Sequence, residues 1–226
     1  YEPSFTRPPW YEHAFEEQQA AREAVALFDQ SPLGKVLLQG RDTEAFLQRV
    51  CATRMDLDAG TARYALALNT RGGIEAEWIV LRLDDERYLV LTGSGQVTRD
   101  MHILRSRRHA DEFVTATDVT TATSVLSVMG PRSREFLAAL TDADLTEDGF
   151  AFSTHREVEV AGVILRAVRV SYIGGLGWEL HVPVETSVQL YDRLHAAGTE
   201  FGLRNAGTYA LDALRIEGGI CSFGLD

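Results

Sequence analysis

Apolar and polar positions follow the same order in two stretches of the chain. Residues 35–47 run as an apolar strand, a glycine turn and the start of a helix, and residues 125–137 run the same way. Aligning Gly40 with Gly130 brings a Phe-Leu pair of each stretch into the same position. The expected helix caps are Asp42 or Thr43 in the first stretch and Ser133 in the second.

Glycine pairs form a second repeated feature. Gly72-Gly73 and Gly174-Gly175 each stand between two apolar runs, which is typical of a β-hairpin. The second pair belongs to a glycine-rich segment, and glycine inside strand-like sequence indicates a bulge or a close approach of the backbone to another group. The two predicted hairpins carry Glu77 and Glu179 at equivalent places.

Helical patterns over residues 95–105 and 186–197 close the two repeats. The simplest interpretation is an α+β fold of antiparallel sheet and helices, made of two pseudo-repeated β–α–β–β–α halves. The expected parts are an N-terminal segment packing on the core, 1–34, and the core domain, 35–226, with halves at about 35–115 and 122–226. Coincidence between two common strand–turn–helix patterns is the alternative.

The composition excludes several classes of function. The 226 residues are 45% hydrophobic, enough for a sizeable core, and the formal net charge is −11. Nucleic acids and anionic membranes select basic partners, so we expect neither to bind this chain. Two cysteines are too few for a disulfide framework or a zinc knuckle. Without a long apolar run or a leader-like start, the chain is expected to be cytoplasmic, or mitochondrial-matrix in a eukaryote.

Motifs for several common chemistries are also missing from the sequence. The segment 92–95 lacks the third glycine of a dinucleotide-binding loop, and no phosphate-binding G-x-x-x-x-G-K-[ST] occurs. His102 and His109 stand among charged residues and are expected to lie on a solvated helix face, so we expect no metal site. Lys35 is the only lysine and the one candidate for Schiff-base chemistry.

The segment from Tyr172 to Glu179 keeps a binding role open. Tyr172 and Trp178 offer ring faces for stacking, and Glu179 offers an acceptor for ring N–H groups. This combination suits a flat, polar heteroaromatic ligand. A tight turn between two strands is the alternative.

Four parts of the chain resemble the folate-binding family of the glycine-cleavage T-protein, an aminomethyltransferase. They are residues 22–31, 64–77, 128–134 and 171–183 with 213–217. Within this family the chain looks closest to the tetrahydrofolate domain of dimethylglycine and sarcosine dehydrogenases. The resemblance implies a central folate pocket, tetrahydrofolate as a bound cosubstrate and no flavin site in this chain. It also implies a longer protein, because the family continues past the equivalent of residue 226 into a C-terminal barrel.

The resemblance assigns Tyr64 and Glu77 to the active site, with Glu77 as the catalytic residue. In the family, a tyrosine and a carboxylate at this spacing lie near the reacting nitrogen of tetrahydrofolate. The carboxylate can hold that nitrogen's proton and stabilise cationic species during transfer. The family usually has two aspartates where this chain has Ala76-Glu77. A solvated hairpin acid is the alternative interpretation of Glu77.

The resemblance also assigns Tyr172 and Glu179 to cofactor binding at the pterin. Glu179 would accept two hydrogen bonds from the amino-pyrimidine edge, and Tyr172 would position the ring. The family often has Glu where this chain has Gly175, so one polar contact of the family is missing.

Trp178 and Arg215 complete the expected cofactor-binding set, each with a structural alternative. Trp178 either lines the pocket or belongs to the core. Arg215 either binds the ligand or pairs with Asp212 or Glu217. The glycine-cleavage enzymes place a folate-binding arginine where this chain has Leu211.

The function implied is tetrahydrofolate-dependent one-carbon transfer. The domain would accept a methylene or aminomethyl unit from an oxidised methylamine (glycine, sarcosine or dimethylglycine type) and give 5,10-methylenetetrahydrofolate. The expected partners are the methylamine-derived substrate and a flavin dehydrogenase domain or subunit. Two alternatives stay open, a folate-binding or scaffold protein without turnover and a folate-dependent demethylase of a sulfonium or an aryl ether.

Overall fold

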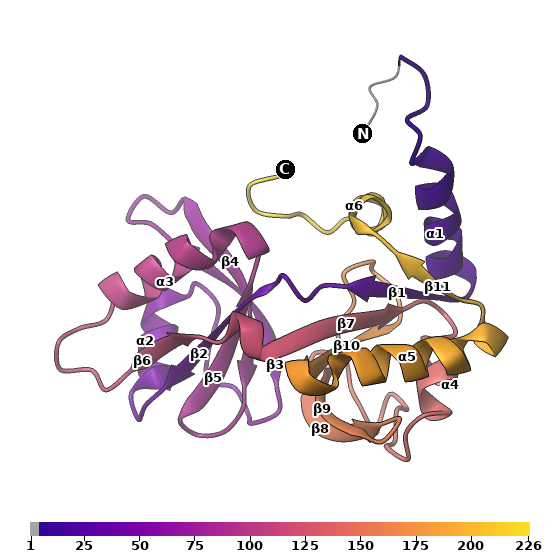
Figure 1. The fold of residues 1–226 in the computed structure, drawn as a ribbon. Helices are drawn as coiled ribbons and strands as arrows, with labels where there is room; N and C mark the ends of the chain where they lie inside the picture. Colours follow the sequence, from indigo (N-terminus) through magenta and orange to yellow (C-terminus); the bar gives the residue numbers. More distant parts are fainter. Residues whose placement is uncertain (1–4) are drawn as a thin grey trace. The chain divides into compact units, whose positions relative to one another are not determined.

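The computed structural model describes residues 5–226 and divides them into two compact units. The first takes in the chain up to Gln30 with Ser124–Phe152 and Glu157–Cys221, and the second takes in Ser31–Thr123, Ser153–Arg156 and Ser222–Asp226. In each unit helices pack on one mostly antiparallel sheet (Figure 1). The division into an N-terminal segment and two halves stays a prediction. The first four residues of that N-terminal segment lie outside the residues that the structure describes.

The first unit contains a six-stranded sheet with the order β11-β1-β7-β10-β9-β8. Its strands are β1 (Val25–Asp29), β7 (Thr123–Met129), β8 (His155–Val160), β9 (Val163–Val168), β10 (Gly177–Pro183) and β11 (Leu203–Ala206). Strand β1 runs parallel to β11 and antiparallel to β7, and β10 runs antiparallel to β9. The helices are α1 (Tyr11–Glu23), α4 (Ser133–Ala138), α5 (Ser187–Gly198) and α6 (Thr208–Glu217), with the 3₁₀ turns η3 (Val184–Thr186) and η4 (Thr199–Phe201).

Strand alternation divides the residues of β10 between the two faces of this sheet. Trp178, Leu180 and Val182 lie in the larger core of the unit, which α4 and α5 cover. Glu179 and His181 must point to the opposite face, because successive side chains of a strand alternate. Helices α1 and α6 pack on that opposite face, over the smaller cluster around Phe28, which we call the Phe28 cluster.

The second unit contains a five-stranded sheet with the order β3-β4-β5-β2-β6. Its strands are β2 (Gly34–Gln39), β3 (Ala62–Leu68), β4 (Ile74–Arg82), β5 (Arg87–Thr92) and β6 (Thr115–Asp118). The helices are α2 (Thr43–Val50) and α3 (Val97–Ser106), with the 3₁₀ turns η1 (Ser94–Gln96) and η2 (Thr120–Ala122). Both α-helices cover the sheet face that carries Trp78 and Tyr88. The side chains that alternate with these along β4 and β5 point to the opposite face of the sheet.

A buried carboxylate fixes α3 to this sheet. Asp100 is 1% exposed, and its Oδ2 accepts a hydrogen bond of 2.8 Å from Trp78 Nε1 and another from the hydroxyl of Thr92. Buried polar groups are stable only when they are hydrogen-bonded, so these contacts hold the first turn of α3 against β4 and β5. The strand that carries Glu77 is thereby held from its core side.

The predicted α+β architecture is confirmed. Strands β3 and β4 flank Gly72-Gly73, β9 and β10 flank Gly174-Gly175, and α3 and α5 occupy the predicted closing helices. Each repeat contains three strands between its two helices, where the sequence predicted two. The observed order β–α–β–β–β–α therefore differs from the prediction by one strand in each repeat.

The expected side-chain caps of α2 and α4 are wrong. Asp42 stands at the N-cap of α2 without a side-chain capping bond, and α4 likewise has none. Thr43 instead donates its hydroxyl to the carbonyl of Gly40 at 2.7 Å, and Ser133 donates to the carbonyl of Gly130 at 2.7 Å. The hydroxyls therefore donate back to the glycine turn rather than accept from the helix amides, in the same way in both repeats.

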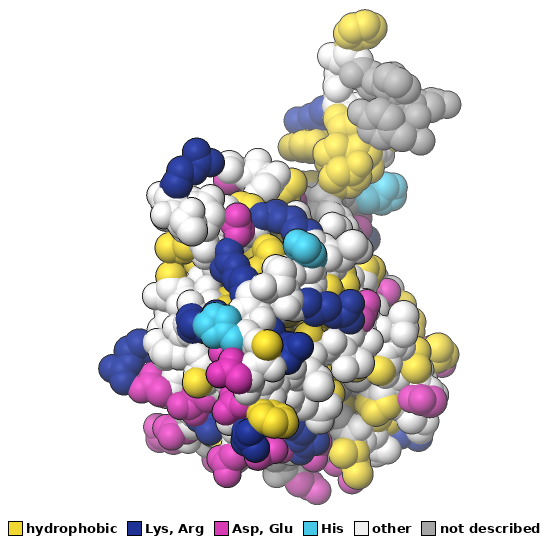
Figure 2. All heavy atoms as spheres, turned by 90° about the vertical axis from the view of Figure 1, so that its left-hand side faces the viewer, with side chains coloured by type: hydrophobic (Ala, Val, Ile, Leu, Met, Phe, Trp, Pro, Cys, Tyr) yellow, Lys and Arg dark blue, Asp and Glu magenta, His cyan; other side chains and the backbone are white. Residues whose placement is uncertain are grey.

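Charge is unevenly distributed over the second unit. The outward side chains of α3 include Arg99, His102 and Arg105, and His109 beyond the helix is also exposed, as expected for a solvated face. In Figure 2 basic and histidine side chains gather over the middle of this face, while acidic side chains gather along its lower edge. Within the described residues, no helix is both long enough and apolar enough to cross a membrane.

Candidate functional site

The β3–β4 hairpin places Tyr64 and Glu77 on one face of the second unit's sheet. In the antiparallel register Leu66 lies opposite Glu77, and Tyr64 lies opposite Ile79. Tyr64 is therefore the diagonal neighbour of Glu77, and such neighbours are about 7–8 Å apart. The Tyr64 side chain is half-exposed and Glu77 is partly buried. The structure thus brings these two predicted site residues together.

The neighbouring position 76 faces the opposite way. Ala76 is 1% exposed and lies in the core with Trp78. An acid at position 76 would therefore point into an apolar core, and Glu77 is the carboxylate that shares a face with Tyr64. The departure of this chain from the family at Ala76 removes no charge from that face.

A backbone amide far away in the sequence contacts Glu77. The N–H of Phe223 donates to Glu77 Oε2 at 2.6 Å. A hydrogen bond to an ionised carboxylate is shorter and stronger than a neutral one. This contact fixes one oxygen of the carboxylate within the second unit.

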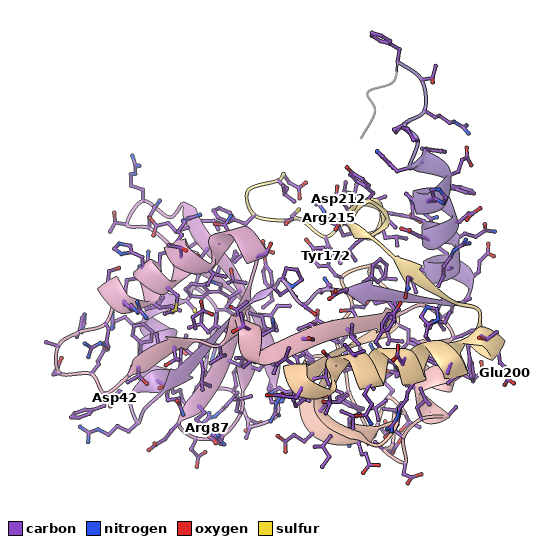
Figure 3. The ribbon with its side chains drawn as sticks, viewed as in Figure 1. Asp42, Arg87, Tyr172, Glu200, Asp212 and Arg215 are labelled. Carbon is purple, nitrogen blue, oxygen red and sulfur yellow. The ribbon has the colours of Figure 1, made fainter. Side chains whose placement is uncertain are left out.

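In the first unit, the glycine-rich connection from β9 to β10 packs closely against the end of α6. Gly174 has φ +75°, and a Cβ at this position would lie 3.2 Å from the Cα of Gly218. The close backbone approach predicted for this segment is therefore confirmed. Tyr172 and Ile173 pack against the Phe28 cluster, and Figure 3 shows Tyr172 beneath α6, near Arg215.

Glu179 and His181 form a buried pair on β10. Each is 4% exposed, and His181 Nε2 lies 3.3 Å from Glu179 Oε2. With Nε2 as the donor, the imidazole orients the carboxylate, and Nδ1 becomes an acceptor. Among residues 5–226 this buried Nδ1 has no hydrogen-bond partner. His181 was not among the predicted site residues, although the alternation along β10 places it two residues from Glu179 on the same face.

The structure does not bring Trp178 together with Glu179. Trp178 is fully buried on the opposite face of the sheet, with its ring 6.5 Å from that of Phe150 in an edge-on arrangement. The guanidinium of Arg169 lies 4.5 Å from the Trp178 ring. Burial lowers the pKa of Arg169, an effect that the charge of Glu147 opposes. The expectation that Trp178 lines the pocket is therefore corrected, because its position in the strand alternation makes it a core residue.

Arg215 is held by contacts within its own unit. Its side chain is buried, with Nε donating to Asp212 Oδ1 at 2.8 Å and Nη1 donating to the carbonyl of Ile220 at 3.1 Å. Figure 3 shows Arg215 and Asp212 together on α6. Glu217, the other expected partner, pairs with Arg22 instead. These contacts support the structural interpretation of Arg215.

The predicted site residues thus fall into two groups. Tyr64 and Glu77 share a face of the second unit, while Tyr172, Glu179 and Arg215 lie on the α6 side of the first unit's sheet. Phe223 was also not predicted as a site residue, because it contacts Glu77 through its backbone amide, which no residue type reveals.

Comparison with known proteins gives the family. Residues 2–226 match the family described as "GCVT N-terminal domain". The chain belongs to this family. A relative from Paenarthrobacter nicotinovorans, "4-methylaminobutanoate oxidase (formaldehyde-forming)", is 36% identical over 226 residues. The human mitochondrial dimethylglycine dehydrogenase is 35% identical over 227 residues.

A solved structure of the GCVT fold agrees with this assignment. The glycine cleavage system aminomethyltransferase T from Bartonella henselae superposes with a TM-score of 0.80 at 25% identity, over 92% of this chain and 55% of that chain. The two relatives above match 100% of this chain, which spans only 27% and 26% of their own lengths. The resemblance inferred from the motifs is therefore confirmed, and the chain corresponds to about a quarter of these relatives.

Proposed function

We propose that this GCVT-family domain binds tetrahydrofolate and transfers a one-carbon unit to it from an oxidised methylamine, giving 5,10-methylenetetrahydrofolate. The observation that carries the proposal is the placement of Tyr64 and Glu77 on one face of the β3–β4 hairpin, in a chain whose family includes an aminomethyltransferase. A carboxylate beside a half-exposed aromatic ring suits a cationic nitrogen next to a flat ligand.

Glu77 is the proposed catalytic residue. Its carboxylate would hold the proton of the reacting folate nitrogen and stabilise the positive charge of the iminium during transfer. Its placement on the face of Tyr64, with Ala76 turned into the core, supports this role. Because position 76 faces the core, Glu77 is the carboxylate proposed to perform both tasks.

Glu179 is the proposed acceptor for the pterin. A carboxylate that is nine-tenths buried needs donors, and the amino-pyrimidine edge presents two parallel N–H groups that match its two oxygens. His181 would orient the carboxylate from behind through Nε2. Tyr172, packed on the Phe28 cluster, would contact the ring.

The relatives indicate the class of donor. One is described as a formaldehyde-forming oxidase of an N-methylated amino acid and another as a dimethylglycine dehydrogenase. Oxidation of an N-methyl group gives an iminium that releases formaldehyde when water attacks it. A folate domain in the same protein would capture the carbon before release, so we propose a flavin-dependent dehydrogenase domain or subunit as the partner.

Calorimetric titration with tetrahydrofolate tests the binding. We expect the wild-type protein to release heat on binding, the Glu179→Ala variant to bind much more weakly, and the Glu185→Ala variant to bind normally. Glu185 is an exposed glutamate on η3 and so serves as the matched control. Absence of heat from the wild type at near-millimolar folate would refute the proposal.

A kinetic assay then tests transfer. Methylene-folate formation from formaldehyde should exceed the uncatalysed rate with the wild type, and should fall most of the way toward that rate with Glu77→Gln while folate still binds. If folate binds but neither the wild type nor any variant exceeds the uncatalysed rate, the non-catalytic folate-binding alternative holds instead.

A further inference from the structure

A tight turn in the second unit presents the amide that contacts Glu77. Leu225 N donates to the carbonyl of Ser222 at 3.1 Å, which closes a four-residue β-turn. Gly224, at the third position of this turn, has φ +88°, the left-handed value that a type II turn requires there. Phe223 occupies the second position, and its N–H points to Glu77.

Two further contacts hold the turn in place. The Arg99 guanidinium lies 5.0 Å from the centre of the Phe223 ring, a cation–π contact with the first turn of α3. The Oδ2 of Asp226 accepts a hydrogen bond of 2.6 Å from Ser222 N. The turn is thus fixed from both ends, with the Phe223 amide directed at the carboxylate.

We propose that Phe223 is a positioning residue for Glu77, acting through its backbone N–H. The proposal rests on the catalytic role of Glu77 proposed above. Within residues 5–226, the Phe223 amide donates to Oε2 of Glu77, and Oε1 accepts no hydrogen bond. One oxygen is therefore anchored, and the other is left to interact with the reacting nitrogen. A carboxylate with one anchored oxygen loses little orientational freedom when the transition state forms.

The turn geometry permits an unusually selective test. Proline is favoured at the second position of a type II turn and has no N–H. The variant Phe223→Pro in the full-length protein therefore keeps the turn but removes both the amide donor and the aromatic ring. The variant Phe223→Ala keeps the donor and loses the ring, so the pair separates the hydrogen bond from the cation–π contact.

We expect Phe223→Pro to lower kcat for methylene-folate formation by about tenfold to a hundredfold, the usual effect of a misplaced catalytic group. Its KM for tetrahydrofolate should stay near that of the wild type, and Phe223→Ala should keep most of kcat. In a Glu77→Gln background Phe223→Pro should have no further effect, because the two residues act as one unit.

Four outcomes would overturn the proposal. Three are an unchanged kcat in Phe223→Pro, an equal loss in Phe223→Ala, and a full additional loss in the Glu77→Gln background. The fourth is a rise in kcat in Phe223→Pro, which would show that the turn blocks Glu77. Calorimetry separates this proposal from the proposed function, since wild-type protein that binds no folate refutes the function whatever the Phe223 variants do.

Discussion

Replacing Gly174 by alanine should destabilise the first unit, whereas replacing its neighbour Gly175 should not. Gly174 has φ +75°, in the left-handed region, and its new Cβ would lie 3.2 Å from the Cα of Gly218. Gly175 has an ordinary φ, and no atom lies within 4 Å of an added Cβ. The two adjacent positions therefore differ in strain and space while sharing the same loop.

The magnitude follows from two opposing effects. A non-glycine residue in the left-handed region costs about 1–2 kcal/mol, and the tight contact with Gly218 adds to that cost. Alanine also restricts the unfolded chain, which stabilises either variant by about 0.4–1 kcal/mol. This gain cancels in the comparison, so Gly174→Ala should be less stable than Gly175→Ala by about 2 kcal/mol.

Urea unfolding followed by tryptophan fluorescence and circular dichroism measures the difference. In thermal unfolding of a chain of this size, the same 2 kcal/mol corresponds to a separation of about 4–8 °C in Tm. The tetrahydrofolate affinity should fall in Gly174→Ala as well, because Tyr172 lies in the same loop. Equal stability of the two alanine variants would refute the claim that Gly174 is required by its contact with Gly218.

Three other predictions concern buried polar groups. Arg215→Met should lower the free energy of unfolding by about 2–3 kcal/mol, because it removes a hydrogen bond to the Asp212 carboxylate and one to a backbone carbonyl. If Arg215→Met lowers this free energy no more than Asp212→Asn does, the hydrogen bond to the carbonyl contributes no stability. Lys35→Met should cost at least about 2 kcal/mol, since the ammonium donates to three backbone carbonyls at 2.9–3.1 Å, and equal urea midpoints would refute this. Burial raises the pKa of Cys51 to about 12 while Cys221 is exposed, so a thiol reagent at pH 8 should label only Cys221 until the protein unfolds. Because the folded-state pKa of Cys51 is raised, its contribution to stability is complete below about pH 8.5 and is lost as the pH rises toward 12, which urea midpoints measured from pH 8 to 11 should show.

Local patterns in the sequence were sufficient for the hairpins and helices. Glycine pairs between apolar runs located both hairpins, and the apolar spacing located α3 and α5, because these elements form through contacts between residues close in the sequence. The resemblance paired Tyr64 with Glu77, and the strand register places both on the β3–β4 hairpin. The direction of the Thr43 and Ser133 hydrogen bonds was not predictable, since a hydroxyl can donate or accept equally well.

By itself, the sequence determined the family, the α+β class and the two glutamates on glycine hairpins. Only the tertiary structure decided which side chains share a face and which backbone groups approach them. Trp178 belongs to the core, Arg215 pairs with Asp212, and the amide of Phe223 meets Glu77 across 146 positions. The physical reason is that periodicity and turn chemistry act over a few residues. Contacts between distant segments depend instead on how whole sheets and helices pack, and a backbone donor carries no mark in the residue type.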